Sequence, residues 1–194
     1  QRGPLSPRET LEVLTPLCAA LEATHGVGLH HGDLSPANVL CPPGAAARLC
    51  DFGMHRLGAA ADARWSGPPG YVPPEVYRGE APTASAAGDV FALGAILFEC
   101  LTGERLFAAP SPSAVMFKIC VAPLPVLPAT VQGDRERLEA LIAMACSKDP
   151  AGRFEHAGAL LRALRVVLVE EPARTPTAPM SVAPIAPAAP PAQL

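Results

Sequence analysis

The chain has 194 residues, of which 49% are hydrophobic and 17% charged, and its formal net charge is −3. This length fits one domain, and the hydrophobic share is sufficient for a buried core. The mildly acidic balance gives no electrostatic reason to expect nucleic acid or an anionic membrane as a partner. The longest apolar run, residues 90–98, is too short for a membrane span of about 20 residues.

The cysteines are six in number, widely spaced and without a C-x-x-C pair. Four lie in apolar stretches with helical character: Cys18, Cys100, Cys120 and Cys146. This spacing disfavours a zinc site or a disulfide framework and indicates reduced, buried thiols. We therefore expect a cytoplasmic protein.

The first predicted helix begins after Ser6 and ends near Gly26. Residues 6–9 read SPRE, which has the form of a capping box with proline in the first turn. Leucines then recur at helical spacing. Three short strands are expected next, over residues 27–29, 39–41 and 48–50.

The second half of the chain is predicted to be helical. Residues 54–74 are rich in Gly, Pro and Ala without periodicity, which indicates a mobile activation-type loop. Helices are expected over four segments: residues 87–101, 113–120, 134–146 and 156–168. The first is apolar nearly all round and is therefore predicted to be buried. Asp134 is the expected cap of the third.

The last segment has a different composition. Residues 172–194 contain seven Pro and seven Ala and no aromatic residue, so they cannot bury enough surface to offset their ordering entropy. The sequence thus predicts a mainly α domain with a few short β-strands over residues 1–168. A Pro/Ala-rich disordered linker is expected over residues 169–194.

Two short motifs place acidic and amide side chains at a distinctive spacing. Residues 31–38 read HGDLSPAN, and thirteen residues after Asn38 the chain reads DFG, beginning at Asp51. Hard oxygen ligands such as those of Asn38 and Asp51 suit Mg²⁺, with phosphates completing its coordination. The Asp33 carboxylate can orient an acceptor hydroxyl and take up its proton. The protein-kinase signature has the same order, with H-R-D-L-x-x-x-N followed by D-F-G.

Three further segments match that signature in order. They read GPPGYVPPE at residues 67–75, DVFALG at residues 89–94 and DPAGRF at residues 149–154. Over roughly residues 4–168 the chain resembles the C-terminal lobe of a bacterial serine/threonine protein kinase of the eukaryotic (Hanks) type. The resemblance implies a protein-kinase-like α+β C-lobe with the N-lobe missing. It also implies signalling by phosphoryl transfer from ATP, with Mg²⁺, to Ser or Thr of a protein substrate.

The resemblance assigns site roles. Asp33, Ser35 and Asn38 are the expected catalytic residues, and Asn38 and Asp51 the expected metal ligands. Leu40 is expected beneath the adenine ring, beside Asn38 and Asp51 in the nucleotide site.

It also assigns structural roles. His31 and Phe52 should pack in an apolar spine, and Glu75 should pair with Arg153. The Asp89 carboxylate should accept hydrogen bonds from the catalytic-loop backbone.

Three positions depart from the family pattern. Gly32 stands where most kinases carry an arginine that pairs with a phosphorylated activation loop, which argues against that mode of switching. Ser35 replaces the lysine that contacts the γ-phosphate, and a hydroxyl brings no positive charge to the transition state. Pro68 replaces the threonine that braces the catalytic acid. These changes favour weak catalysis.

The chain contains neither a G-x-G-x-x-G loop nor a V-A-I-K lysine. We therefore expect an incomplete C-lobe fragment with negligible turnover alone. The Pro/Ala tail is expected to tether it to a further module or membrane anchor beyond Leu194. Two alternatives stay open. One is a pseudokinase or scaffold. The other is a small-molecule phosphotransferase of the aminoglycoside or choline kinase type, whose catalytic loop has glycine where Gly32 stands.

Overall fold

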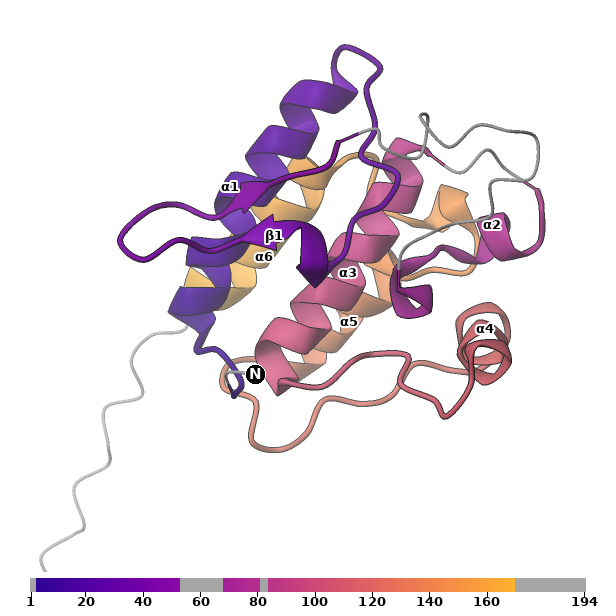
Figure 1. Ribbon diagram of the computed structural model, residues 1–194. Coiled ribbons are helices and arrows are strands. Elements are labelled where there is room, and N and C mark those ends of the chain that lie inside the picture. The colour runs from indigo at the N-terminus through magenta and orange to yellow at the C-terminus, as the bar shows by residue number, and fades with distance from the viewer. Residues whose placement is uncertain (1–2, 53–67, 81–83, 170–194) are drawn as a thin grey trace, which may run out of the picture.

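The computed structural model describes residues 3–52, 68–80 and 84–169 (Figure 1). Their regular structure consists mainly of helices: α1 Pro7–His25, α2 Pro74–Tyr77, α3 Ala86–Thr102, α4 Pro112–Cys120, α5 Arg135–Ala145 and α6 Ala157–Val169. The described strands are β1 Val39–Leu40 and β2 Arg48–Leu49, which pair antiparallel. The prediction of a mainly α fold with a few short strands is confirmed.

Helix α1 begins with the predicted capping box. The Ser6 backbone N–H donates to Glu9 Oε2 at 2.8 Å, and the Glu9 N–H donates to Ser6 Oγ at 3.3 Å. These two bonds satisfy donors that the first helical turn leaves without intrahelical partners. Asp134 likewise caps α5 by accepting from the Arg137 N–H. The local sequence thus fixes where both helices begin.

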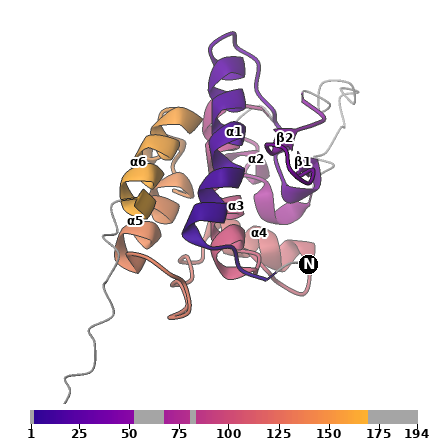
Figure 2. The ribbon, with the colours of Figure 1, turned by 90° about the vertical axis from the view of Figure 1, so that its left-hand side faces the viewer.

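Helix α3 is the centre of the fold. Its residues from Val90 to Phe98 are all buried, as its apolar composition predicts. It contacts α1, α5 and α6. Figure 2 shows α5 and α6 on one side of α1 and α3, and the β1–β2 hairpin on the other.

One glycine sets how closely α3 approaches α5. A Cβ added at Gly94 would lie 2.7 Å from both Ala145 Cβ and Cys146 Sγ. Real Cβ atoms do not come this close, so the helices can pack at this distance only because Gly94 has no side chain.

The prediction of a strand over residues 27–29 is wrong. The backbone N–H groups of Val27 and Leu29 both donate to Thr24 O, at 3.1 and 2.9 Å. They therefore complete the last turn of α1 and are not available for a strand ladder. Gly28, with φ +72°, reverses the chain direction in the left-handed region that glycine adopts readily.

All six cysteines are free thiols. Cys18 and Cys146 are buried as predicted, while Cys100 and Cys120 are half-buried. Burial raises the pKa of both Cys18 and Cys146 to about 12. Within residues 3–52, 68–80 and 84–169, none of the helices has the length and apolar character needed to cross a membrane.

Two expectations fall largely outside the described residues. They are the mobile loop, apart from residues 68–74, and the linker over residues 169–194. The division into a domain and a linker therefore stays a prediction.

Candidate active site

Asn38 is hydrogen-bonded to Asp33 and to the residue that precedes Asp51. The Asn38 amide Nδ2 donates to the Asp33 carbonyl at 2.7 Å. On the other side, the Cys50 N–H donates to the Asn38 carbonyl at 3.0 Å, next to Asp51. Pairing of Val39 with Leu49 in the β1–β2 ladder holds this register. Segments 13 residues apart in the sequence thus meet at one edge of the hairpin.

Asp51 has an uncommon backbone conformation. Its φ is +61°, the one positive φ among the described residues other than glycine. Aspartate is one of the few residue types that enter this region, and such conformations concentrate at functional sites. Its side chain is exposed. The negative charge of Asp51 also helps to raise the pKa of the neighbouring Cys50 thiol, although desolvation is the larger cause.

The donor set fits a hard divalent cation. Asn38 uses its amide nitrogen to bind the loop, so its oxygen is the atom left to ligate, and Asp51 adds a carboxylate. Oxygen donors of this kind are what Mg²⁺ binds, with phosphate oxygens and water filling the remaining positions. The described residues contain no cluster of three His, Cys, Asp or Glu that could hold a metal unaided.

His31 links the two motifs through its ring. The ring is fully buried, and its Nδ1 accepts the Asp33 backbone N–H at 3.3 Å. Its Nε2 therefore carries the proton and donates to the Cys50 carbonyl at 3.0 Å. The ring also packs against Phe52, with centroids 4.7 Å apart. The predicted packing of these two rings is confirmed, and the hydrogen bonds add a role that the prediction lacked.

The backbone of the predicted catalytic loop is fixed by Asp89 of α3. This buried carboxylate accepts the N–H groups of His31 and Gly32 at 2.8 and 2.9 Å, as expected. Gly32 has φ +75°, in the region where a side chain is costly. The glycine that departs from the family pattern is therefore well suited to the shape of the loop.

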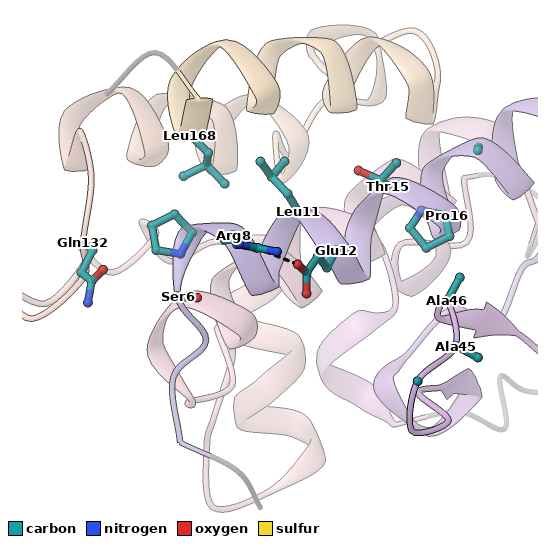
Figure 3. Close-up of a pocket in the computed structure, with 13 residues that line it drawn as sticks. Ser6, Arg8, Leu11, Glu12, Thr15, Pro16, Ala45, Ala46, Gln132 and Leu168 are labelled. Carbon is teal, nitrogen blue, oxygen red and sulfur yellow. Dashed lines mark hydrogen bonds and ion pairs between the residues drawn. The ribbon is translucent and has the colours of Figure 1, made fainter. Parts of the chain in front are cut away.

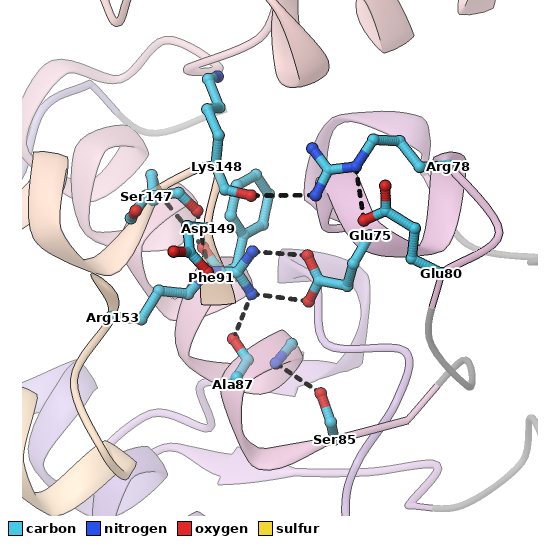
Figure 4. Close-up of polar contacts among 12 residues, drawn as sticks. Glu75, Arg78, Glu80, Ser85, Ala87, Phe91, Ser147, Lys148, Asp149 and Arg153 are labelled. Atoms are coloured by element: carbon cyan, nitrogen blue, oxygen red, sulfur yellow. Dashed lines mark hydrogen bonds and ion pairs between the residues drawn. The ribbon is translucent and has the colours of Figure 1, made fainter. Parts of the chain in front are cut away.

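A buried ion pair fixes the segment before α3 (Figure 4). Arg153 donates from Nη1 and Nη2 to the two oxygens of Glu75, at 2.8 and 2.6 Å. Their side chains are 0% and 4% exposed. Arg153 also donates to the carbonyls of Ala87 and Ser147, and its guanidinium lies over the Phe91 ring. The predicted pairing of Glu75 with Arg153 is confirmed.

Two predicted site residues differ sharply in exposure. Leu40 is 52% exposed, which is unusual for a large apolar side chain and leaves it available to a ligand. Ser35 is 1% exposed, and its Oγ has no hydrogen-bond partner within the part of the chain that the structure describes. The role of Ser35 as a phosphate contact stays a prediction, and its burial speaks against it.

A wide groove of about 1140 Å³ lies elsewhere, between α1, the turn between β1 and β2, and the end of α6 (Figure 3). Leu11, Pro16 and Leu168 contribute apolar walls, and the Arg8–Glu12 ion pair lies beside them at 2.9 Å. None of the predicted site residues lines this groove. Of the residues predicted for the site, Asp33 and Asn38 are half-buried, and Leu40 and Asp51 are exposed.

Comparison with known proteins agrees with the fold and with the arrangement of the motifs. Residues 1–162 match the model of the protein kinase domain. The chain belongs to the protein kinase domain family, as the fragment formed by its C-terminal lobe.

Its relatives include bacterial enzymes. It is similar to serine/threonine-protein kinase PknB of Mycolicibacterium smegmatis, with 37% identity over 164 residues, 80% of this chain and 25% of the relative. PknB of Mycobacterium tuberculosis is 34% identical over 183 residues, 90% of this chain and 28% of the relative. PknL of M. tuberculosis is 32% identical over 174 residues, which are 88% of this chain and 43% of the relative. The chain thus spans less than half the length of these relatives.

Proposed function

We propose that the protein containing this lobe transfers the γ-phosphoryl group of ATP to serine or threonine hydroxyls of other proteins, with Mg²⁺. The observation that supports this proposal is that Asn38 hydrogen-bonds both the Asp33 carbonyl, through its side chain, and the Cys50 N–H beside Asp51, through its backbone. The names of the mycobacterial relatives support the choice of protein hydroxyls as acceptors.

Each of the three residues has one proposed task. Asp33 orients the acceptor hydroxyl and takes up its proton. Asn38 and Asp51 hold Mg²⁺, which neutralises negative charge on the phosphates of ATP when bound. The exposed Leu40 side chain offers an apolar surface for the adenine ring. Signalling as the biological role, and residence in the cytoplasm, are part of the same proposal.

The proposal predicts weak transition-state stabilisation by this lobe. No lysine stands at position 35, and the serine found there is buried. No arginine stands at position 32 to pair with a phosphorylated loop residue. Binding of Mg²⁺ and ATP is thus expected to be kept while turnover is low compared with a complete family pattern.

The test is phosphoryl transfer from labelled ATP by a fusion of this chain to a kinase small lobe. A generic basic protein and an aminoglycoside are offered side by side, and products are read by mass spectrometry. We expect Ser or Thr phosphorylation of the protein, lost in Asp33→Asn. Labelling of the aminoglycoside alone would establish the small-molecule alternative. ATP binding without transfer, unchanged by Asp33→Asn, would establish the scaffold.

A further inference from the structure

The wide groove along α1 is an apolar surface that the proposed chemistry does not use. Leu168 of α6 and Leu11 of α1 mark one end of it (Figure 3). Toward the other end, Pro16 lies near Ala45 and Ala46 of the turn between β1 and β2. Its volume is about 1140 Å³. An exposed apolar groove of this kind is typical of a surface that binds another chain segment.

The α1 wall of the groove also carries a backbone acceptor. Proline has no N–H, so Pro16 does not supply the donor that the Glu12 carbonyl would receive in a regular helix. Glu12 and Pro16 both line the groove. A segment of chain lying there can therefore donate a backbone N–H to this carbonyl, in addition to burying apolar side chains.

The chain continues from this groove into the Pro/Ala-rich tail. Leu168 lines the groove, and residues 169–194 follow it. The tail has few large apolar side chains, and most of them lie in one short stretch, residues 179–185, which reads PMSVAPI. This stretch is therefore the part of the tail best able to fill an apolar groove.

The spacing within this stretch suits an extended conformation. A polyproline II helix has three residues per turn, so Pro179, Val182 and Ile185 would lie along one edge of it. In that conformation the stretch spans about 19 Å. The α1 wall of the groove, from Arg8 to Ala19, is about 16 Å long. The stretch and the groove thus match in length as well as in apolar character.

Covalent connection favours this occupant over a separate partner. Ten residues, 169–178, separate Leu168 from Pro179. They can span up to about 31 Å, nearly twice the length of the groove. A tether of this length gives the attached segment an effective concentration on the order of millimolar at the groove. A weakly binding segment of the same chain therefore occupies the groove before a dilute partner does.

We propose that residues 179–185 of the tail dock in the groove between α1, the β1–β2 turn and α6 of the same chain. Val182 and Ile185 cover the apolar wall, and a backbone N–H of the segment donates to the Glu12 carbonyl. A segment too poor in apolar residues to form its own core can still become ordered by binding. The proposal is independent of the phosphoryl transfer proposed above.

The test is NMR spectroscopy of the full chain labelled with ¹⁵N and ¹³C. Wild type is compared with Ala19→Glu, which places a charge in the groove, and with Ala23→Glu as the matched control. Both alanines are exposed on α1, one helical turn apart, and of the two only Ala19 lines the groove. The measured quantities are the order parameter of the Val182 amide and nuclear Overhauser effects from the Val182 and Ile185 methyl groups to Leu11 and Ala19.

In wild type and Ala23→Glu we expect an order parameter of about 0.85, the value of rigid backbone, together with Overhauser effects to the groove. In Ala19→Glu the order parameter should fall below about 0.6 and the Overhauser effects should disappear. A wild-type value below about 0.6 overturns the proposal, as does an equal loss in the two Glu variants. An ordered tail without Overhauser effects to the groove overturns it too.

A second copy of the chain is the alternative occupant. In a mixture of labelled and unlabelled protein, Overhauser effects between the two kinds of chain would assign the groove to a second copy and overturn docking within one chain.

Substitutions in the tail decide the matter if Ala19→Glu does not fold. Val182→Asp should release the segment and lower its order parameter, while Ala183→Asp, on another edge of the extended segment, should leave it bound. The same result for both Asp variants would overturn the proposal.

Discussion

Two regions of this lobe differ in how far their charged side chains are exposed to solvent. The framework, made of Glu75, Asp89 and Arg153, is buried, and every charge in it is matched by a partner within hydrogen-bond distance. The edge formed by the candidate site residues, Asp33, Asn38, Leu40 and Asp51, is half-buried or exposed. Charges in the framework therefore determine stability, while those at the edge are available for chemistry.

The largest effect is expected from breaking the framework ion pair. Arg153→Met leaves the Glu75 carboxylate buried without its cation, which should lower the free energy of unfolding by about 3–5 kcal/mol. Urea unfolding followed by circular dichroism measures this loss.

An exposed ion pair provides the control. Arg8→Met removes the partner of Glu12, where the side chains are 89% and 60% exposed, and should leave the free energy of unfolding nearly unchanged. Similar losses in both variants would contradict the division into framework and edge.

A smaller effect is expected where α3 approaches α5. Gly94→Ala inserts a Cβ 2.7 Å from Ala145 Cβ and Cys146 Sγ, and overpacking of this kind costs about 1–3 kcal/mol. Gly70→Ala is the matched control, since no atom lies within 4 Å of its added Cβ and its φ is not positive. If the two variants unfold at the same urea concentration, the claim that α3 and α5 pack too closely at Gly94 to admit a side chain is contradicted.

The buried thiols predict a dependence on pH. Burial raises the pKa of Cys146 from its ordinary value of 9.0 to about 12 in the folded protein. Above pH 9 the unfolded chain loses this proton and the folded chain keeps it, so stability is complete below pH 9 and falls as pH rises toward 12.

Unfolding free energies of wild type and Cys146→Ala test this dependence between about pH 8 and pH 11. The variant starts lower, because a buried group has been removed, but its decline with pH should be shallower. If the unfolding free energies of the two proteins fall in parallel as the pH rises, Cys146 ionises as easily in the folded protein as in the unfolded chain.

How far the sequence predicts this lobe depends on the range of the interaction. The first residues of α1 and α5 were predictable because Ser6 and Asp134 cap the helix N-termini through hydrogen bonds to residues three positions further on. The prediction of a strand at residues 27–29 was wrong because the Val27 and Leu29 N–H groups donate to the Thr24 carbonyl.

Longer-range contacts were predictable only where a family pattern described them. Asp89 and the Glu75–Arg153 pair were found through that resemblance, and the structure confirms them. The contact of His25 Nε2 with Asp89 Oδ2, at 2.8 Å, was not predicted, because a lone histidine at a helix end gives no periodic signal for a partner 64 residues away.

The smallest effect on stability is expected at the edge. Asp51 is exposed with φ +61°, and Asn adopts this conformation as readily as Asp, so Asp51→Asn should change the unfolding free energy by less than about 0.5 kcal/mol. The effect of Asp51→Asn on metal binding should be large, because a neutral amide replaces the carboxylate. Mn²⁺ added with ATP should broaden the NMR signals of Asn38 and Asp51 in wild type, and the variant should need a higher concentration of Mn²⁺ for the same broadening. Glu80→Gln, which neutralises another exposed carboxylate, should leave the broadening unchanged. Equal broadening in wild type and Asp51→Asn would remove Asp51 from the proposed metal site while leaving the framework intact.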